Sequence, residues 1–398
     1  MVTGCSLISV IPRGIRQLLS MYIPFLPVSL QSSVSGSLSP DLNDPRIMFF
    51  EFGRQAMRVG LDALGIKKGD TVLMPTSLCS AVIEPFYDMG VKIRLYELGQ
   101  NLKFSLDDIL ASVTATTKAI YVIHYFGIRS DMADLRRFCT QRNIALIEDC
   151  ALSGYSVESS QLEFGDVCIY SLWKFHALPD GAILKIKKQL DPFKNSVYKP
   201  PAILKTLIRR LKIEIKKRTM RGAFPLKTLN IVRGKRKDIP LSNERGEKLS
   251  PMTAINGISQ LSLHCFLRED LEGIAYQRRS NFNSLTAYCR SNNIRTLYRQ
   301  LAEHDIPYCF PIVVDNPMFV KKKLAEAGIE SEISVNVPPS LSNLIDNTKN
   351  YSHLEQLSLR CISIPIHQNI DAAMLDYLKS KLSSVIALAD GDGDANQS

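Results

Sequence analysis

The sequence lacks the features that would assign it to a class directly. It has nine cysteines, an odd number, and no CxxC pair, so neither a disulfide framework nor a zinc ribbon is supported. No run of about 18 or more uncharged apolar residues occurs, which argues against a membrane-spanning helix. With 45% apolar and 22% charged residues, the composition is that of an ordinary globular protein, and disorder of the whole chain is excluded.

The N-terminus and the cysteines bear on the compartment. Arg13 and Arg16 precede an apolar stretch, which is the order of parts in a signal peptide. Pro24 and Pro27 interrupt that stretch and no small-x-small cleavage site follows at once, so we expect a protein of the reducing cytoplasm. Five cysteines lie in apolar runs and are expected to be buried thiols: Cys79, Cys139, Cys150, Cys168 and Cys309.

The length of 398 residues exceeds one ordinary core and predicts a large domain with a smaller one attached. Residues 1–45, rich in Ser and Pro, are interpreted as an N-terminal arm. We expect the large domain at 46–255, the small domain at 256–390 and a disordered polar tail at 391–398. The net charge of +10 is uneven, because residues 187–248 hold 19 Lys or Arg and 5 Asp or Glu, a balance of +14.

Strand and helix patterns alternate regularly from Arg46 onward. The expected strands are 70–74, 92–96, 119–123 and 145–147, and the expected helices are 54–64, 79–89, 106–113 and 132–142. This order predicts an α/β fold with a mainly parallel central sheet and crossover helices, in which ligands sit at the carboxyl ends of the strands. Further on, helical patterns cover 253–291 and 371–386, and a weaker α/β pattern at 308–327 predicts the smaller C-terminal α/β domain.

A carboxylate stands at the end of a strand in the run Ile147-Glu148-Asp149-Cys150-Ala151. Two acidic residues at a buried strand end are costly unless they have partners. Asp149 could pair with a cationic ligand group such as a pyridinium nitrogen. A helix N-cap or a structural ion pair explains the same residues, and taken alone that explanation is favoured.

A hydroxyl and a lysine follow the next strand, in the run GDVCIYSLWK from Gly165 to Lys174. Ser171 and Lys174 are three residues apart, beside the only tryptophan. Lysines that form Schiff bases occupy such desolvated positions. For an arbitrary lysine, however, an exposed side chain at a strand end is the favoured interpretation.

Two weaker signals concern phosphate binding. The run Phe52-Gly53-Arg54-Gln55-Ala56 begins a helix, whose free amides and dipole suit a phosphate, although most helix starts bind nothing. The run PTSLCS, from Pro75 to Ser80, is a hydroxyl-rich loop after a strand that could also touch phosphate. Turn chemistry explains that loop equally well.

The order of these pieces resembles the DegT/DnrJ/EryC1/StrS family of sugar aminotransferases, which depend on pyridoxal 5'-phosphate (PLP) and have the aspartate aminotransferase type of fold. The matching stretches are FGRQAMRVGLDALGIKKGD, TVLMPTSLC, TKAIYVIHYFGIRSDMADL, IALIEDCA and GDVCIYSLWKFHALPDGAIL. A weaker likeness continues in SPMTAINGISQL, AYQRRSNF, YCFPIVV and SIPIHQNI. The block from Asp149 to Lys174 is the most specific part of the resemblance.

The resemblance implies roles for particular residues. Lys174 matches the lysine that forms the internal aldimine, and Asp149 matches the carboxylate that keeps the cofactor's ring nitrogen protonated. The implied cofactor-binding residues are Lys174, Asp149, Ser171, Gly53, Arg54, Gln55, Ser77 and Cys79. His124 matches the histidine of a "VHxxG" turn with a structural role, and Pro365 and His367 match a C-terminal turn near the active site.

Several positions depart from the family pattern and indicate a divergent branch. Leu152 stands where members have Gln or His near the cofactor's phenolic oxygen, and Cys79 aligns with the aromatic residue that stacks on the ring. The serine-to-lysine spacing is three residues rather than five, and Gly181 is followed by Ala182 instead of a second glycine. For the asparagine that members donate across the dimer, Asn243 is only a guess.

The function implied by the resemblance is ping-pong transamination from glutamate or glutamine to a nucleotide-linked keto-sugar, for surface polysaccharide or natural-product synthesis. A homodimer is implied as well. Because the dehydratase branch of the family replaces the lysine with histidine, Lys174 argues against that branch. The departures at Leu152 and Cys79 motivate an alternative, a non-catalytic binding or regulatory protein that uses the basic segment as its interaction surface.

The basic segment contains an amphipathic pattern from Ala202 to Arg221. Its apolar residues near one face are Ile203, Leu204, Leu207, Ile208, Leu211 and Ile215. A solvated helix docked on the body or on a dimer partner is the first interpretation, and a patch for a membrane surface or an anionic substrate is the sharper one. Nucleic-acid binding is least favoured, because residues 187–248 hold only three aromatic residues, Phe193, Tyr198 and Phe224.

Overall fold

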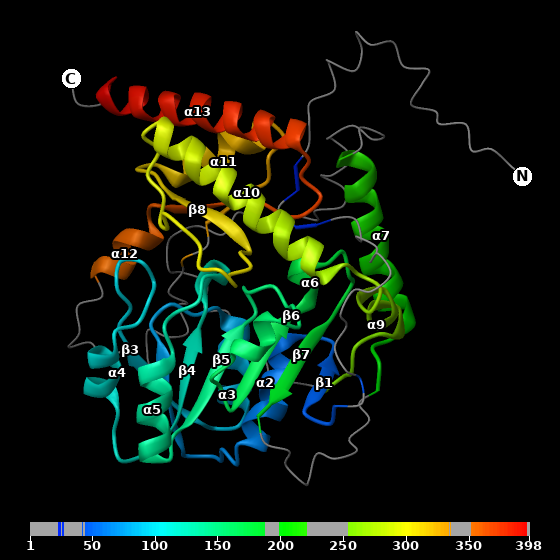
Figure 1. Ribbon diagram of the computed structural model, residues 1–398, viewed down its shortest axis with the longest axis vertical. Coiled ribbons are helices and arrows are strands. Elements are labelled where there is room, and N and C mark those ends of the chain that lie inside the picture. Colours follow the sequence, from blue (N-terminus) through cyan, green and yellow to red (C-terminus); the bar gives the residue numbers. More distant parts are fainter. Residues whose placement is uncertain are drawn as a thin grey trace, which may run out of the picture.

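The computed structural model describes residues 23–24, 26–27, 42, 44–187, 199–220, 254–333, 335 and 352–395 (Figure 1). The strands are β1 (Ile47–Phe50), β2 (Thr71–Pro75), β3 (Lys92–Tyr96), β4 (Thr117–Ile123), β5 (Ala145–Cys150), β6 (Val167–Ser171), β7 (Ala182–Ile186), β8 (Cys309–Val313), β9 (Glu332–Ile333) and β10 (Cys361–Pro365). The helices are α2 (Gly53–Ala63), α3 (Ser80–Asp88), α4 (Leu106–Ser112), α5 (Ala133–Arg142), α6 (Leu172–Phe175), α7 (Ile203–Met220), α9 (Gln260–Phe266), α10 (Leu271–Ser291), α11 (Pro317–Glu326), α12 (Ser352–Ser358) and α13 (Ala372–Ala395), with 3-10 turns η2 (Tyr125–Gly127) and η3 (Ser159–Leu162).

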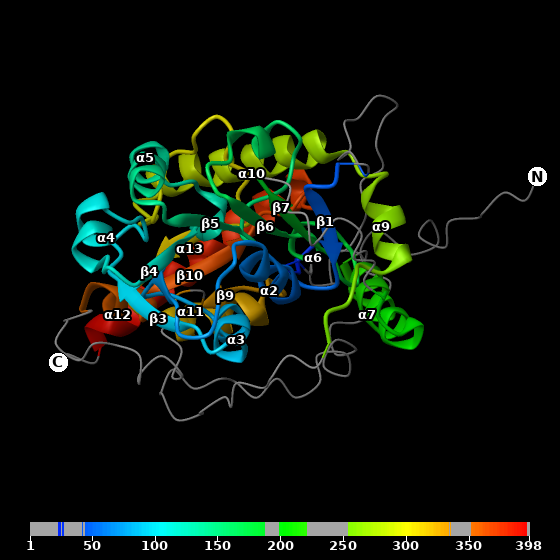
Figure 2. The ribbon, with the colours of Figure 1, turned by 90° about the horizontal axis from the view of Figure 1, so that it is seen from below.

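The larger sheet has seven strands in the order β1-β7-β6-β5-β4-β2-β3. Five of them, from β6 to β3, pair in parallel, whereas β7 and β1 are antiparallel to their neighbours. Seen from below in Figure 2, α2 and α3 lie on one face and α5 on the other. These observations confirm the predicted α/β fold with a mainly parallel sheet and crossover helices.

The central strands are covered on both faces, as parallel strands usually are. Every residue of β2 and of β6 is buried. Their runs TVLMP and VCIYS therefore read as continuous apolar strands rather than as alternating ones. Because β6, β5, β4 and β2 run in the same direction, their carboxyl ends meet at one edge of the sheet, where ligands bind in this architecture.

A smaller antiparallel sheet, in the order β8-β10-β9, packs with α10, α11 and α13 above that edge (Figure 1). The N-terminal arm reaches it, because the Ile23 amide donates to the Gly328 carbonyl (2.9 Å) and the Glu330 amide donates to the Ile23 carbonyl (2.9 Å). Ile23 thus contacts the segment between α11 and β9. Of the helices that the structure describes, none combines the length and apolarity that a membrane crossing needs.

The predicted helices and strands of the large domain agree with the observed ones to within two residues at most ends. The helical pattern predicted over 253–291 is confirmed for most of its length, but residues 254–259 are not helical and the rest forms two helices, α9 and α10. Ser259 caps α9 by accepting from the Ser262 amide, and Asp270 caps α10 by accepting from the Gly273 amide. Because each N-cap begins a helix, the caps at Ser259 and Asp270 divide the segment into two helices.

The C-terminal helix is also longer than its sequence pattern indicates. We expect a helix ending at residue 386 and a disordered tail from 391, but the backbone of α13 stays helical to Ala395. Residues 396–398 lie outside the described residues, as do most of the predicted arm and much of the basic segment. Asn243, the guess for the asparagine donated across a dimer, lies outside them too.

Candidate active site

The candidate site is built on two neighbouring parallel strands. Asp149 of β5 lies opposite Ile169 of β6, and Cys150 lies opposite Tyr170. Ser171 ends β6, and Lys174 follows on the single turn of α6. Strand pairing therefore brings Asp149, Ser171 and Lys174 to the same edge of the sheet, as the sequence predicts.

Lys174 is half-buried and lies beside an aromatic ring. Its Nζ is 5.8 Å from the centroid of the Tyr308 ring, within the range of a cation–π interaction. The turn that carries Lys174 is fixed by backbone bonds, since the Leu172 amide donates to the Gly181 carbonyl (2.9 Å) and the Gly181 amide donates to the Glu51 carbonyl (2.9 Å). Gly181 has a φ of +137°, a conformation that favours glycine.

Asp149 is buried and held by two donors. Its Oδ1 accepts from the Ala151 amide (2.8 Å), and its Oδ2 accepts a short hydrogen bond from the Tyr121 hydroxyl. Burial, followed by the charge of Asp149, raises the pKa of Tyr121 well above its ordinary value, so the hydroxyl stays a donor. Tyr121 orients the carboxylate, a role that sequence reasoning missed because an aromatic residue in a strand is usually core.

The start of α2 packs on β6, as a phosphate site near Ser171 requires. A Cβ on Gly53 would lie 3.7 Å from Ile169 Cγ2, so the helix approaches the strand closely here. The Gln55 amide, however, donates to the Phe52 carbonyl (3.1 Å), and the Gln55 side chain accepts from the Phe52 amide (3.1 Å). The structure thus makes Gln55 a capping residue whose amide is already used, and leaves Gly53 and Arg54 as the phosphate candidates.

The loop after β2 contributes further polar groups at this edge. Ser77 is buried, and its carbonyl accepts a short hydrogen bond from the Tyr125 hydroxyl. Thr76 is buried as well, and its Oγ1 has no hydrogen-bond partner among the described residues. An unsatisfied buried hydroxyl is costly unless a ligand or water meets it, so this loop is a candidate binding element.

Cys79 corrects one prediction. Of the five cysteines expected to be buried, Cys139, Cys150, Cys168 and Cys309 are buried, but Cys79 is exposed. It is the N-cap of α3, just past the end of β2, so it sits on the sheet edge rather than inside an apolar run. It lies near the Tyr121 hydroxyl, which holds Asp149.

A buried arginine joins the small domain to the turn that carries Lys174. Arg278 of α10 is 1% exposed and donates to the carbonyls of Pro307 (3.2 Å) and Tyr308 (3.1 Å) and to that of Phe175 (3.4 Å). Gln368 links the same groups, donating to the Phe175 carbonyl (2.8 Å) and accepting from Arg278 Nε (3.1 Å). Burial lowers the pKa of Arg278 to about 9, which leaves it charged at neutral pH.

The predicted C-terminal turn lies next to this arginine. His367 is buried, and its Nε2 donates to the Pro24 carbonyl of the N-terminal arm (2.8 Å) while its Nδ1 accepts from the Asn369 amide (3.3 Å). The neutral ring therefore satisfies both neighbours. Burial, followed by the charge of Arg278, lowers the pKa of His367 to about 3.

This neutral histidine predicts a pH dependence of stability. In the unfolded chain His367 titrates near its ordinary pKa of about 6.5, so below that pH the unfolded state binds one more proton than the folded state. Its contribution to the free energy of unfolding is full above about pH 6.5 and falls by up to about 1.4 kcal/mol per pH unit toward pH 3.

Urea titrations at several pH values from pH 7 to pH 4.5 give the free energy of unfolding at each pH. That free energy should change less with pH in His367→Gln than in the wild type. His304→Gln, at an exposed side chain, is the control and should keep the pH dependence of the wild type. The same pH dependence in all three proteins would contradict the assignment.

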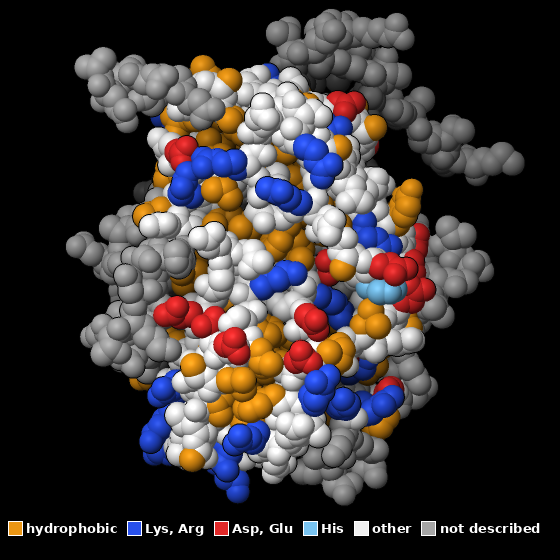
Figure 3. Space-filling view, turned by 60° about the vertical axis from the view of Figure 1, so that its left-hand side comes forward, with side chains coloured by type: hydrophobic (Ala, Val, Ile, Leu, Met, Phe, Trp, Pro, Cys, Tyr) orange, Lys and Arg blue, Asp and Glu red, His pale blue; other side chains and the backbone are white. Residues whose placement is uncertain are grey.

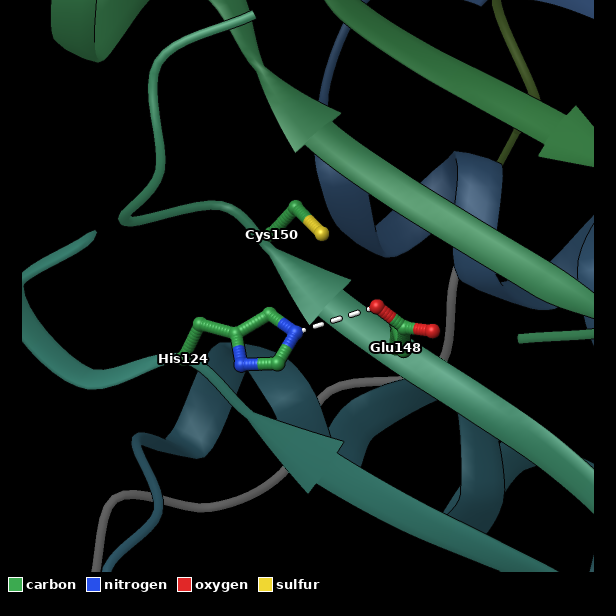
Figure 4. A group of neighbouring side chains, drawn as sticks. All are labelled: His124, Glu148 and Cys150. Carbon is green, nitrogen blue, oxygen red and sulfur yellow. Dashed lines mark hydrogen bonds and ion pairs between the residues drawn. The ribbon is translucent and has the colours of Figure 1, made fainter. Parts of the chain in front are cut away.

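A second buried histidine belongs to a structural pair (Figure 4). His124, after the end of β4, meets Glu148 of β5 through Nε2 and Oε2 at 3.0 Å, and Cys150 lies beside them. Because His124 Nδ1 accepts from the Ser130 amide (3.4 Å), the ring donates to Glu148 from Nε2. Burial alone would raise the pKa of Glu148, but the hydrogen bonds from His124 and from the Phe164 amide hold that pKa below its ordinary value.

His, Glu and Cys are all residue types that bind metal ions, and these three side chains lie close together. Hydrogen bonds within the protein, however, already satisfy the polar atoms of His124 and Glu148. The Phe164 and Gly165 amides both donate to Glu148 Oε1, so the carboxylate is satisfied. Burial, followed by the charge of Glu148, raises the pKa of the Cys150 thiol well above its ordinary value, and a thiol is a poorer metal ligand than a thiolate. We interpret His124 and Glu148 as a pair that holds the ends of β4 and β5 together.

The glycine that follows His124 is required by close packing. Gly127 has a φ of +83°, and a Cβ there would lie 2.4 Å from the Ile306 carbonyl oxygen and 2.5 Å from that of Leu152. The Gly154 amide also donates to the Ile306 carbonyl (3.1 Å). The segment before Tyr308 is thus packed directly on the chain that leaves Asp149, which fixes the small domain against the site.

Comparison with known proteins gives matches over the same region. Residues 50–178 match the DegT/DnrJ/EryC1/StrS aminotransferase family. GDP-perosamine synthase of Vibrio cholerae is 31% identical over 132 residues, which are 32% of this chain and 36% of that protein. Protein MosB of Rhizobium meliloti is 36% identical over 132 residues, 32% of this chain and 26% of that protein. The matches thus span about a third of the curated relatives' own length.

Solved structures resemble the chain over more of its length. A putative sugar aminotransferase from Streptococcus pneumoniae in its PMP form has a TM-score of 0.63 at 17% identity, and the likeness covers 92% of this chain and 100% of that one. NtdA from Bacillus subtilis with bound cofactor PMP has a TM-score of 0.62 at 16% identity, covering 92% and 85%. These likenesses show that the chain shares the fold of these two structures. Within that fold, residues 50–178 are similar to the DegT/DnrJ/EryC1/StrS aminotransferase family.

Proposed function

We propose that the protein is a PLP-dependent aminotransferase that moves an amino group from glutamate or glutamine to a nucleotide-linked keto-sugar. The observation that carries the proposal is the meeting of Lys174 and Asp149 at the ends of adjacent parallel strands. Lys174 is half-buried on its own turn, and Asp149 is buried with its carboxylate oriented by Tyr121. An amine and a fixed carboxylate at one sheet edge are the two groups that PLP chemistry requires of a protein.

The residues at this edge fit PLP. The cofactor needs an amine for its aldehyde, an anion for its ring nitrogen and donors for its phosphate. Lys174 offers the amine and Asp149 the anion, while Ser171 and the first amides of α2 offer donors at a helix start. The Thr76 hydroxyl, buried with no partner among the described residues, is a further donor that a bound group would satisfy.

When bound, PLP acts as an electron sink for the carbon atom that loses a proton. Lys174 Nζ would hold and move that proton, as a general base and acid. Asp149 would hold the ring nitrogen, and the hydrogen bonds from Tyr121 and from the Ala151 amide keep its carboxylate in place. The Tyr308 ring lies beside Lys174 and restricts where its amine can move.

The relatives support the substrate class. Besides the perosamine synthases, similar proteins include a dTDP-4-dehydro-2,3,6-trideoxy-D-glucose 4-aminotransferase and a UDP-N-acetyl-3-dehydro-alpha-D-glucosamine 3-aminotransferase. All of these names describe sugars carried by nucleotides, which favours such an acceptor here and a place in surface-polysaccharide or natural-product synthesis. A homodimer in the cytoplasm is part of the same proposal. The role of residues 202–221 is separate, because it belongs to α7 and not to this chemistry.

The test is spectroscopic. Purified protein mixed with PLP should develop a visible absorbance band, glutamate or glutamine should convert that band, and a nucleotide-linked 4-keto-sugar should restore it. A band that forms and stays unchanged with every amino donor would favour the alternative, a non-catalytic binding or regulatory protein. This alternative is favoured by Cys79, which is exposed and stands where the resemblance places an aromatic residue that stacks on the cofactor ring.

A further inference from the structure

Helix α7 presents its apolar side chains to solvent. Figures 1 and 2 both show it at the outer edge of the molecule, beside α9. Its exposed aliphatic residues are Ile203 (78%), Leu204 (70%), Leu207 (54%), Ile208 (49%) and Leu211 (61%). Positions that recur every three or four residues share one face of a helix, so these five side chains form a continuous stripe, which we call the α7 stripe.

The opposite face of α7 is docked on the body through polar and charged side chains. Thr206 is buried there, Arg209 donates to Glu51 Oε1 (2.8 Å), and Arg210 donates to the Ala177 carbonyl (2.8 Å). About two turns after Arg209, Lys216 pairs with Glu330 at 3.1 Å. A helix on a protein surface normally buries its apolar face and exposes its charged face, whereas α7 does the reverse. An exposed apolar stripe of this kind marks a surface that another body covers.

The charge of α7 indicates what kind of partner would cover the α7 stripe. The helix carries seven Lys or Arg and a single Glu, and exposed Lys205, Lys212 and Arg218 border the α7 stripe. On the side of the molecule shown in Figure 3, turned away from α7, Lys, Arg, Asp and Glu side chains are interspersed instead. A second copy meeting this helix around a two-fold axis would oppose like charges, which disfavours self-association through α7.

We propose that α7 is a docking helix for an anionic lipid bilayer. Apolar side chains that enter the boundary between headgroups and acyl chains, flanked by lysines whose stems follow them, are the chemistry by which amphipathic helices lie on membranes. Basic residues next to that face attract anionic headgroups. The face that anchors α7 carries its ion pairs to Glu51 and Glu330, so the helix can lie on a bilayer without leaving the body.

Docking through α7 places the candidate site close to the lipid surface. Arg209 contacts Glu51 and lies over the Phe52 ring (4.7 Å), immediately before the start of α2. Arg210 holds the carbonyl of Ala177, three residues after Lys174. The proposal does not depend on the aminotransferase activity, because it concerns a face of α7 that takes no part in the chemistry.

The experiment is cosedimentation of the full chain with vesicles of phosphatidylcholine alone and of phosphatidylcholine mixed with phosphatidylglycerol. We expect binding to the anionic vesicles, at least about tenfold weaker binding to the neutral ones, and weakening by salt. The double variant Leu207→Ser and Leu211→Ser should lose at least about tenfold in affinity for anionic vesicles. Lys212→Glu with Arg218→Glu should lose the preference for them. Leu388→Ser, at an exposed leucine of α13, is the matched control and should bind as the wild type does.

Two results would overturn the proposal. One is a wild-type protein that binds neither vesicle or binds both equally. The other is a leucine double variant that keeps full vesicle binding but changes from a larger assembly to a smaller one in sedimentation velocity, which would make the α7 stripe an interface between copies. Thermal unfolding and the PLP absorbance band of each variant show that the fold and the candidate site are intact, so a failure of the proposed enzymatic function would be seen separately.

Discussion

Lys174→Ala is expected to abolish turnover, lowering it by at least about 1000-fold, because no other group then moves the proton at the reacting carbon. The same change should remove the covalent attachment of PLP. Treatment with borohydride followed by peptide mass mapping should find the cofactor fixed to the peptide that contains Lys174 in the wild type and to no peptide in the variant. This measurement depends on attachment and not on the identity of the sugar.

The matched control is Lys118→Ala. Lys118 is an exposed residue near the start of β4, at the edge of the sheet away from Asp149. It should leave both the absorbance band and the turnover unchanged. If Lys174→Ala keeps the band and the modified peptide maps elsewhere, the assignment of Lys174 is wrong even if the protein is an aminotransferase.

Asp149→Asn is expected to lower turnover by about 100- to 1000-fold, the usual effect of removing one fixed charge or donor from a catalytic site. The amide keeps the size of the carboxylate and can still accept from the Tyr121 hydroxyl, so the fold should survive. What is lost is the negative charge that faces the cofactor's ring nitrogen. Steady-state kinetics at saturating substrate, with added PLP, measures the effect on kcat.

Two further variants separate charge from position. Tyr121→Phe removes the donor but keeps the charge of Asp149, so its effect should stay below about tenfold, the scale of one hydrogen bond. Asp134→Asn, at an exposed aspartate on α5, should have none. Full activity in Asp149→Asn would show that the carboxylate has only a structural role.

Much of the large domain could be predicted from the sequence, because its strands are short apolar runs separated by amphipathic helices. The edge that carries Asp149 and Lys174 follows from the parallel strand order alone. The break between α9 and α10 was not predicted, since both helices have apolar spacing and the signal lies in Ser259 and Asp270, which cap through their side chains. Local capping decides where a helix begins, and periodicity does not reveal it.

The missed parts of the candidate site depend on contacts between distant segments. Tyr121 and Tyr308 have the appearance of core aromatics, and only their positions beside Asp149 and Lys174 distinguish them. Arg278 lies on a helix with many polar residues, and nothing in its surroundings along the chain indicates a buried cation. Gln55 was expected to offer its amide to phosphate, but the capping bond to Phe52 requires a geometry that composition does not show. The roles of Lys174, Asp149, Ser171, Gly53 and Arg54 remain predictions.

Arg278 of α10 and the Tyr308 ring contact the turn that carries Lys174. Both residues are translated well after Lys174, so the surroundings of the lysine are made in two stages. Tyr308 follows Lys174 by 134 residues. At ribosomal rates of about 5 to 20 residues per second, its ring is made roughly 7 to 27 s after the lysine. During that interval the nascent chain holds every strand of the larger sheet but not the aromatic ring that lies beside Lys174 in the folded protein. The environment of Lys174 is therefore complete only after the segment that carries Tyr308 has been made and has packed on the turn of α6.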